Sequence, residues 1–108
     1  MARIPTRFAG PAQVSNAAAT KYTVAASEKI IVRHIHVQNP SGSPVTFTMS
    51  IGADAAGTRI FDAFSIAAGA VLDHFCYYDL DAAEIIQALA GTNNILVLTI
   101  DGDRIVLG

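Results

Sequence analysis

The strict alternation of residues 45–51 constrains the fold of this chain more than any other feature. Apolar Val45, Phe47, Met49 and Ile51 alternate with Thr46, Thr48 and Ser50. Successive side chains of a β-strand point to opposite faces, so this pattern predicts a strand with one buried face and one hydrated face.

Seven further segments have the composition of strands and lie between turn signals rich in Gly, Pro, Asn and Asp. They are residues 21–24, 29–39, 58–64, 71–78, 84–89, 95–100 and 103–107. We expect 29–39 and 45–51 to pair as an antiparallel hairpin. We also expect Asp101-Gly102 to form a hairpin turn before the last strand, which would lie exposed at a sheet edge.

The longest of these segments, 29–39, separates its side chains into two sets. Ile31, Ile35 and Val37 are predicted to share one face. His34 and His36 are predicted to lie on the opposite face with Gln38.

About eight strands at spacings of roughly 8–12 residues, without an amphipathic helix, are typical of an all-β fold. We predict an antiparallel β-sandwich, either jelly-roll-like or immunoglobulin-like. Residues 1–20 are rich in Ala and Gly and contain Pro5 and Pro11. They are predicted to be an N-terminal arm with a short extended piece around Ile4 to Ala9, followed by a single domain over 21–108.

Composition excludes several classes of protein. The 108 residues fit one domain, and the net charge of −2 gives no basis for nucleic-acid binding. No apolar run reaches the roughly 18 residues of a membrane span. No signal-peptide pattern follows Met1, so we expect synthesis in the cytoplasm. Cys76 is the single cysteine, which excludes an internal disulfide.

Only 15% of the residues are charged, against about 25% in a typical soluble domain. The charges are also divided unevenly. Residues 1–54 hold five basic and two acidic residues, net +3, and residues 55–108 hold two basic and seven acidic residues, net −5. The two halves could complement each other within one fold or between neighbouring copies.

His34 and His36 have the spacing of two metal ligands on one strand face, and His74 is a candidate third ligand, since it is predicted to face solvent. A cupin-like centre would also need a Glu about four residues later, where this chain has Asn39 and Pro40. Catalytic zinc sites usually offer three protein ligands. A metal on a three-fold axis between copies is an alternative. The simpler interpretation is two polar residues on an outer face, so we predict no metal and no cofactor.

Four other groups are better explained structurally than catalytically. A catalytic pair of Cys76 and His74 would need an acidic residue to orient the histidine, and the sequence does not place one there. A free Cys is commonly a small buried residue. The loop 52–57 lacks the Lys and helix of a phosphate-binding loop, and Asp54 more simply caps a turn. The acidic residues 79–84 lack the loop of an EF-hand. Aromatic residues in segments 58–64 and 71–78 can form core, an interface or a sugar-stacking platform. We predict no catalytic residues.

Three stretches resemble small proteins encoded in the structural gene clusters of tailed bacteriophages. They are Lys21-Tyr22-Thr23-Val24, a long strand 29–39 that ends in Asn39, and the Thr- and Ser-rich stretch from Thr46 to Arg59. The resemblance covers most of the chain and rests on strand and turn patterns. It implies a non-enzymatic virion component, in either the tail or the capsid, and carries over no catalytic residue.

The resulting expectation is a bacteriophage structural protein that oligomerises, as a trimer most simply, and docks on other virion proteins. Arg3 and Arg7 are the candidate docking residues of the arm. His34, His36, His74 and Tyr78 form the candidate interface or ligand face. The alternatives are a module that binds host-surface carbohydrate and a small cupin-like metalloprotein. Neither nucleic acid nor a membrane is an expected partner.

Overall fold

The computed structural model describes residues 2–107, and within them every regular element is a strand. The eight strands are β1 (Ala2–Gln13), β2 (Ala19–Thr23), β3 (Glu28–Gln38), β4 (Val45–Ile51), β5 (Arg59–Ile66), β6 (Val71–Leu80), β7 (Ile85–Ala90) and β8 (Val97–Val106). They form two four-stranded antiparallel sheets, here called sheet A (β1-β8-β3-β6) and sheet B (β2-β7-β4-β5). The predicted all-β sandwich is therefore confirmed.

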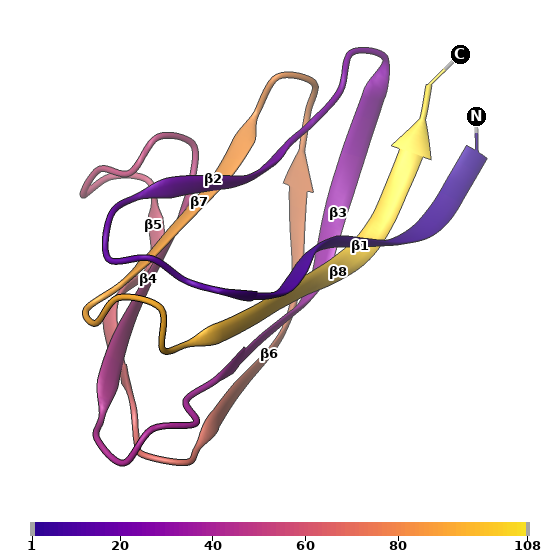
Figure 1. Cartoon of the computed structure of the whole chain (residues 1–108). Coiled ribbons are helices and arrows are strands. Elements are labelled where there is room, and N and C mark those ends of the chain that lie inside the picture. The colour runs from indigo at the N-terminus through magenta and orange to yellow at the C-terminus, as the bar shows by residue number, and fades with distance from the viewer. Residues whose placement is uncertain (1, 108) are drawn as a thin grey trace.

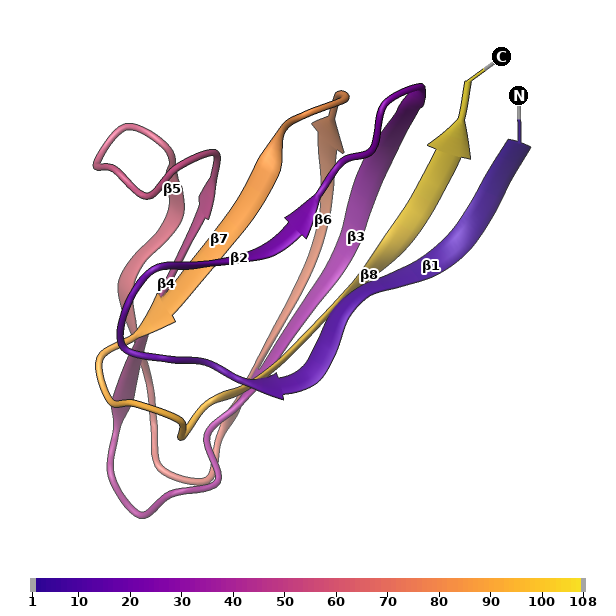
Figure 2. The same ribbon diagram turned by 45° about the horizontal axis from the view of Figure 1, so that its top comes forward.

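The strand order is that of a jelly roll. β1 pairs with β8, β2 with β7, β3 with β6 and β4 with β5, so the chain folds back on itself as one long hairpin wrapped over two sheets. Figures 1 and 2 show the two sheets facing each other, with the start of β1 beside the end of β8. Two four-stranded sheets connected in this way form a jelly roll rather than an immunoglobulin sandwich.

The expected hairpin of residues 29–39 and 45–51 is wrong, because β3 lies in sheet A and β4 in sheet B. The connection between them crosses the sandwich instead of turning within one sheet. Buried Asn39 holds this crossing, since its amide nitrogen donates to the carbonyls of Ser43 (2.8 Å) and Ile66 (2.9 Å).

The predicted N-terminal arm is also wrong for residues 2–13, which form the edge strand β1. They pair with β8 from Ala2–Val106 to Gln13–Val97, and Phe8 is buried in the core. The extended piece expected around Ile4 to Ala9 lies within this strand, but the prolines concealed its full length and its pairing. An edge strand tolerates proline, because one side of its backbone needs no sheet partner.

Residues 97–106 form one continuous strand, so neither the predicted turn at Asp101-Gly102 nor a separate last strand is present. β8 lies between β1 and β3 and is not a sheet edge. A Cβ on Gly102 would lie 2.0 Å from the carbonyl oxygen of Ile31. Glycine here thus serves close approach of two strands, not a turn.

A register shift between Val32 and His34 marks a β-bulge at Arg33 in β3. The bulge reverses the inward and outward alternation of the strand. Ile35 and Val37 belong to the core as predicted, but Ile31 lies on the other face, opposite Asp79 and Asp103. The prediction that Ile31 shares their face is therefore wrong.

The core lies between the sheets and is built from both. Its fully buried side chains include Phe47 and Met49 from β4, Ile35 from β3, and Leu98 and Ile100 from β8. The alternation of residues 45–51 is thus confirmed for the core face. The predicted hydrated face is wrong for Thr48 and Ser50, which are buried because neighbouring backbone covers them: the Thr48 hydroxyl accepts from the Ala63 nitrogen (3.0 Å) and the Ser50 hydroxyl donates to the Gly52 carbonyl (2.9 Å). No helix of the described residues is long and apolar enough to cross a membrane.

Candidate functional site

The outer face of sheet A, which points away from sheet B, collects most of the side chains with functional chemistry. Cross-strand pairing places His34 opposite Phe75 and Asp101, and His36 opposite Asp73. This face includes Arg3, Arg7, Arg33, His34, His36, Asp73, Phe75, Tyr77, Asp79, Asp101 and Asp103.

His34 and His36 meet on one carboxylate, that of Asp73. The Asp73 Oδ1 atom accepts hydrogen bonds from His34 Nε2 at 3.0 Å and from His36 Nδ1 at 2.6 Å. The bond from His36, and then that from His34, lowers the pKa of Asp73 below its usual value. The ring of Phe75 stacks on His34 at 4.4 Å between centroids.

His74 and Tyr78 lie on the other side of β6, where they pack against the core. His74 forms a hydrogen bond with the Tyr78 hydroxyl (3.0 Å) and an edge contact with Phe61 (5.0 Å). Both are half-buried and lie opposite the core residues Ile35 and Val32. They share a face as predicted, but not with His34 and His36, and His74 does not face solvent. His74 is therefore not the third ligand of the predicted histidine pair.

Cys76 is half-buried on the same inner side of β6. Burial, and to a lesser degree the charge of Asp101, raises the pKa of its thiol to about 11. The sulfur donates to the Val32 carbonyl (3.5 Å), while His74 bonds to Tyr78. A thiol with such a pKa is almost wholly protonated at neutral pH, which is the opposite of an activated nucleophile.

Two aromatic side chains of β6 are exposed on the outer face. Phe75 is 76% and Tyr77 63% exposed, although large aromatic residues usually contribute to a core or an interface. The Arg33 guanidinium lies 5.7 Å from the Tyr77 ring centroid. These rings form the most exposed aromatic surface among the described residues.

Arg3 and Arg7, the predicted docking residues, lie in β1 on this same face. Arg3 is bound to Asp103 at 2.7 Å, and Arg33 binds the same carboxylate oxygen at 3.1 Å. Arg7 lies opposite Asp101 in the register of β1 and β8 and lines a shallow open depression with Arg33. Basic residues of the first half thus meet acidic residues of the second half within one fold.

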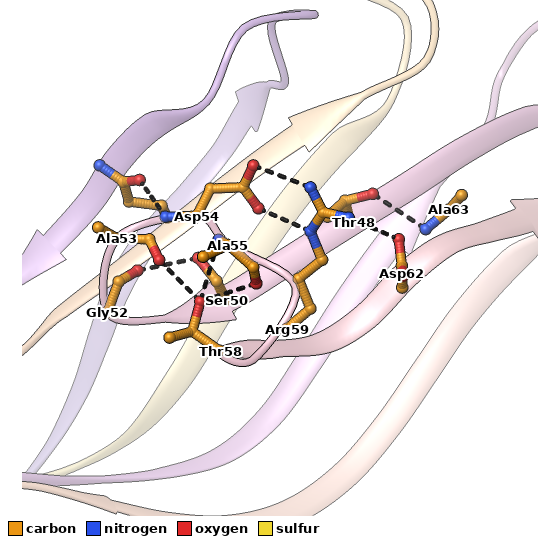
Figure 3. A network of polar contacts seen from close by, with 11 residues as sticks. Thr48, Ser50, Gly52, Ala53, Asp54, Ala55, Thr58, Arg59, Asp62 and Ala63 are labelled. Carbon is orange, nitrogen blue, oxygen red and sulfur yellow. Dashed lines mark hydrogen bonds and ion pairs between the residues drawn. The ribbon is translucent and has the colours of Figure 1, made fainter.

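The loop 52–57 is closed by polar contacts, most of them with side chains of residues outside the loop (Figure 3). Arg59 binds both carboxylate oxygens of Asp54, at 2.9 and 3.2 Å, and also binds Asp62. The bond from Arg59 lowers the pKa of Asp54. The Thr58 hydroxyl donates to the carbonyls of Ala53 and Ala55. The loop is therefore held by contacts with Thr58, Arg59 and Gln87, whose side-chain oxygen accepts a hydrogen bond from the Asp54 backbone (2.9 Å). The prediction that Asp54 caps a turn is not confirmed, because its carboxylate binds the Arg59 guanidinium and the Thr58 hydroxyl accepts from the Ala55 backbone instead.

The acidic residues 79–84 are likewise engaged locally. Lys29 binds Asp79 at 3.1 Å and approaches Asp81 to 3.7 Å. The Glu84 carboxylate accepts a hydrogen bond from the Asp81 backbone at 2.7 Å. These contacts account for the three carboxylates without a calcium ion.

Sequence reasoning found the histidine pair but missed Asp73 as its partner. The signal was present only in the strand register, because Asp73 meets His36 through the pairing of β3 with β6. The exposure of Tyr77 was hidden in the same way, since nothing in the sequence says which face of β6 covers the core. Comparison of this chain with protein-family models, with curated proteins and with solved structures gave no match.

Proposed function

We propose that the chain is a non-enzymatic structural protein of a tailed-bacteriophage virion, which associates with copies of itself and docks on the particle. The observation that carries the proposal is the exposure of Phe75 and Tyr77 on the outer face of sheet A. Covering such rings removes apolar area from water at roughly 25 cal/mol per Å². A closed symmetric oligomer is the common way to cover a self-complementary face.

The fold supports this proposal by analogy. Jelly rolls occur in viral capsid proteins, lectin domains and cupins, the same three classes that the sequence left open. Fold alone does not decide among them. The resemblance of residues 21–59 to phage structural proteins favours the first class. The thiol of Cys76 and the engagement of His74 by Tyr78 supply no activated nucleophile that would favour an enzyme.

The location of β1 changes how docking would work. Arg3 and Arg7 belong to the sheet face rather than to a free arm, and Arg3 is held by Asp103. We therefore assign docking to the outer face of sheet A as a whole. If residues 1–19 were only an arm, their deletion would leave the fold intact. Because β1 pairs with β8, we instead expect the deletion to expose β8 and to destabilise the fold.

Light scattering coupled to size exclusion tests self-association on the full chain. We expect an oligomer, a trimer most simply, that becomes a monomer in the double variant Phe75→Ser/Tyr77→Ser. The matched control is Phe64→Ser, because Phe64 is 46% exposed but lies in sheet B. A monomeric wild type at all concentrations, or an unchanged mass of the double variant, would contradict the proposed interface. Circular dichroism verifies that each variant is folded.

A carbohydrate-binding module is the second candidate, favoured by the same exposed rings. Tyr77 with Arg33 above it offers a stacking surface with a charged neighbour, whereas Tyr78 is turned toward the core. A glycan array would show binding that is lost in Tyr77→Ala and kept in Tyr78→Phe. Silence across a broad array would exclude this candidate.

A further inference from the structure

We propose that His34, His36 and Asp73 form a binding site for a divalent transition-metal ion, with Zn²⁺ as its representative. The donor atoms of the three side chains all lie within 4.8 Å of one another. The site does not depend on the proposed virion role. It also differs from a cupin-like centre, because it lies on the outside of the sandwich rather than among the core residues.

The separations of the donor atoms are close to those that a metal requires. With bonds of about 2.1 Å, the ligands of a tetrahedral zinc site lie about 3.4 Å apart. Asp73 Oδ1 lies 2.6 Å from His36 Nδ1 and 3.0 Å from His34 Nε2. Each ring would have to withdraw from the carboxylate by less than about 1 Å. The two ring nitrogens, which lie within 4.8 Å of each other, would have to adopt the same separation of about 3.4 Å, and side-chain rotations provide both movements.

The backbone and neighbouring side chains hold this arrangement in advance. His34 and His36 project from the same face of β3, a strand paired on both sides, and Asp73 is fixed opposite His36 by the β3–β6 register. The Phe75 ring stacks nearly parallel on His34, at an interplanar angle of 7°. Preorganised ligands lose less conformational entropy when they bind an ion.

A second carboxylate, that of Asp101, lies near the ring nitrogen of His34 that would not bind the metal. Asp101 Oδ1 lies 3.9 Å from His34 Nδ1, the ring nitrogen that does not face Asp73. Metal-bound histidines commonly donate their other ring N–H to a carboxylate, which fixes the tautomer and increases the basicity of the ligand. Asp73 and Asp101 together also supply two negative charges for a dication.

The donor set indicates which ion fits. Imidazole nitrogens suit Zn²⁺, Cu²⁺, Fe²⁺ and Ni²⁺, whereas Mg²⁺ and Ca²⁺ prefer sites made of oxygen ligands. On binding, the ring nitrogen of each histidine that faces Asp73 would ligate the ion, and the single proton of the neutral imidazole would lie on the other ring nitrogen. Three protein ligands leave a fourth position, which on this half-exposed face is open to water or to a donor from another molecule.

Isothermal titration of the chelator-treated full chain, without an affinity tag, tests the site. We expect saturable binding of one Zn²⁺ per chain and no saturable binding of Mg²⁺. His34→Ala, His36→Ala and Asp73→Asn are each expected to weaken Zn²⁺ binding by about tenfold or more, since loss of an outer partner alone costs 10- to 100-fold.

Two variants serve as matched controls. His74→Gln removes the remaining histidine of the chain, and Asp79→Asn removes another exposed carboxylate of β6. Both are expected to keep wild-type affinity and the increase in Tm that Zn²⁺ produces. The proposal is overturned if wild type shows no saturable Zn²⁺ binding, if Asp73→Asn binds as tightly as wild type, or if one ion is shared by three chains. Melting curves without metal distinguish loss of ligands from loss of fold.

Discussion

Asn39 is the polar residue that joins the two sheets. It is fully buried and donates to carbonyl groups of two segments, while its side-chain oxygen accepts from the Ser41 backbone (3.1 Å) and hydroxyl (2.7 Å). A buried polar side chain is stable only when its hydrogen bonds are satisfied. The identity of Asn39 is therefore required by the crossing between β3 and β4.

Asn39→Ala is expected to lower the free energy of unfolding by about 2 kcal/mol or more, because it removes the hydrogen bonds of a fully buried amide to the carbonyls of Ser43 and Ile66. Ser41→Ala is the control and should cost about 1 kcal/mol or less, since Ser41 is only half-buried. Urea denaturation measures both variants. Equal losses would contradict the role given to Asn39.

The sequence could reveal only those site residues that lie on the same strand, because it does not show which strands pair. The spacing of His34 and His36 was enough to place them on one face, and that part is confirmed by their common contact with Asp73. Period-two alternation carries no information about the partner strand or about a bulge such as the one at Arg33. For that reason the sequence could not predict that Asp73 joins the two histidines, or that Ile31 lies on the other face from Ile35 and Val37.

At the scale of elements, β1 is part of the sandwich rather than an appendage. Phe8 is 7% exposed and packs against Tyr22 at 4.8 Å between centroids, so β1 supplies core as well as backbone pairing. The strand also covers one side of β8, which would otherwise be an unpaired edge open to association with other chains.

Phe8→Ala is expected to destabilise the protein by about 3 kcal/mol, the usual cost of removing a buried aromatic side chain. Ile4→Ala in the same strand should cost less than about 1 kcal/mol, because Ile4 is 36% exposed. Thermal and urea denaturation provide the comparison. An unchanged stability of Phe8→Ala would restore the interpretation of this segment as an arm.

The pairing of β3 with β8 requires glycine at position 102. A methyl group there would meet the Ile31 carbonyl oxygen at 2.0 Å and the Arg33 nitrogen at 2.9 Å, both on the backbone. Gly102→Ala is expected to cost at least about 2 kcal/mol by overpacking. Gly42→Ala, which meets nothing within 4 Å, should stay within about 0.5 kcal/mol of wild type. Similar stabilities of the two variants would show that β3 and β8 can move apart to admit a methyl group, and would contradict the requirement for glycine at position 102.

Most strands of the fold could be predicted from the sequence, but their partners could not. Residues 45–51 were located to the residue, because one face is buried and the other is polar. The Asp-Gly pair at 101–102 was misleading, because glycine also serves strand contacts closer than a Cβ allows. In a jelly roll most pairs join segments far apart in the chain, which local turn signals do not report.

At the scale of the whole molecule, basic residues of the first half of the chain form salt bridges with acidic residues of the second half. Arg3, Lys29 and Arg33 from the basic half bind Asp103 and Asp79 from the acidic half. These contacts favour the intramolecular interpretation of the charge pattern. They also leave the exposed rings of Phe75 and Tyr77, rather than charge, as the main feature for association.

Stability is expected to fall on acidification. Hydrogen bonds from Arg3 and Arg59 lower the pKa values of Asp103 and Asp54 below the ordinary value of 3.8. The unfolded chain then binds more protons than the folded chain below about pH 5, so the stabilisation present above that pH is lost as pH falls through the folded pKa values. The urea midpoint should decrease from pH 5 to pH 2, and less steeply in Asp103→Asn. A urea midpoint that rises as the pH falls from 5 to 2 would contradict the stabilising role given to Asp103 and Asp54.

The central claim is that the chain is a structural part of a phage particle. Quantitative mass spectrometry of gradient-purified phage particles, from lysates in which the chain is produced, tests it most directly. We predict that the chain sediments with the particles in several copies each and that Phe75→Ser/Tyr77→Ser reduces this amount, while Phe64→Ser does not. A chain that is abundant in the lysate but absent from the purified particles would contradict the claim.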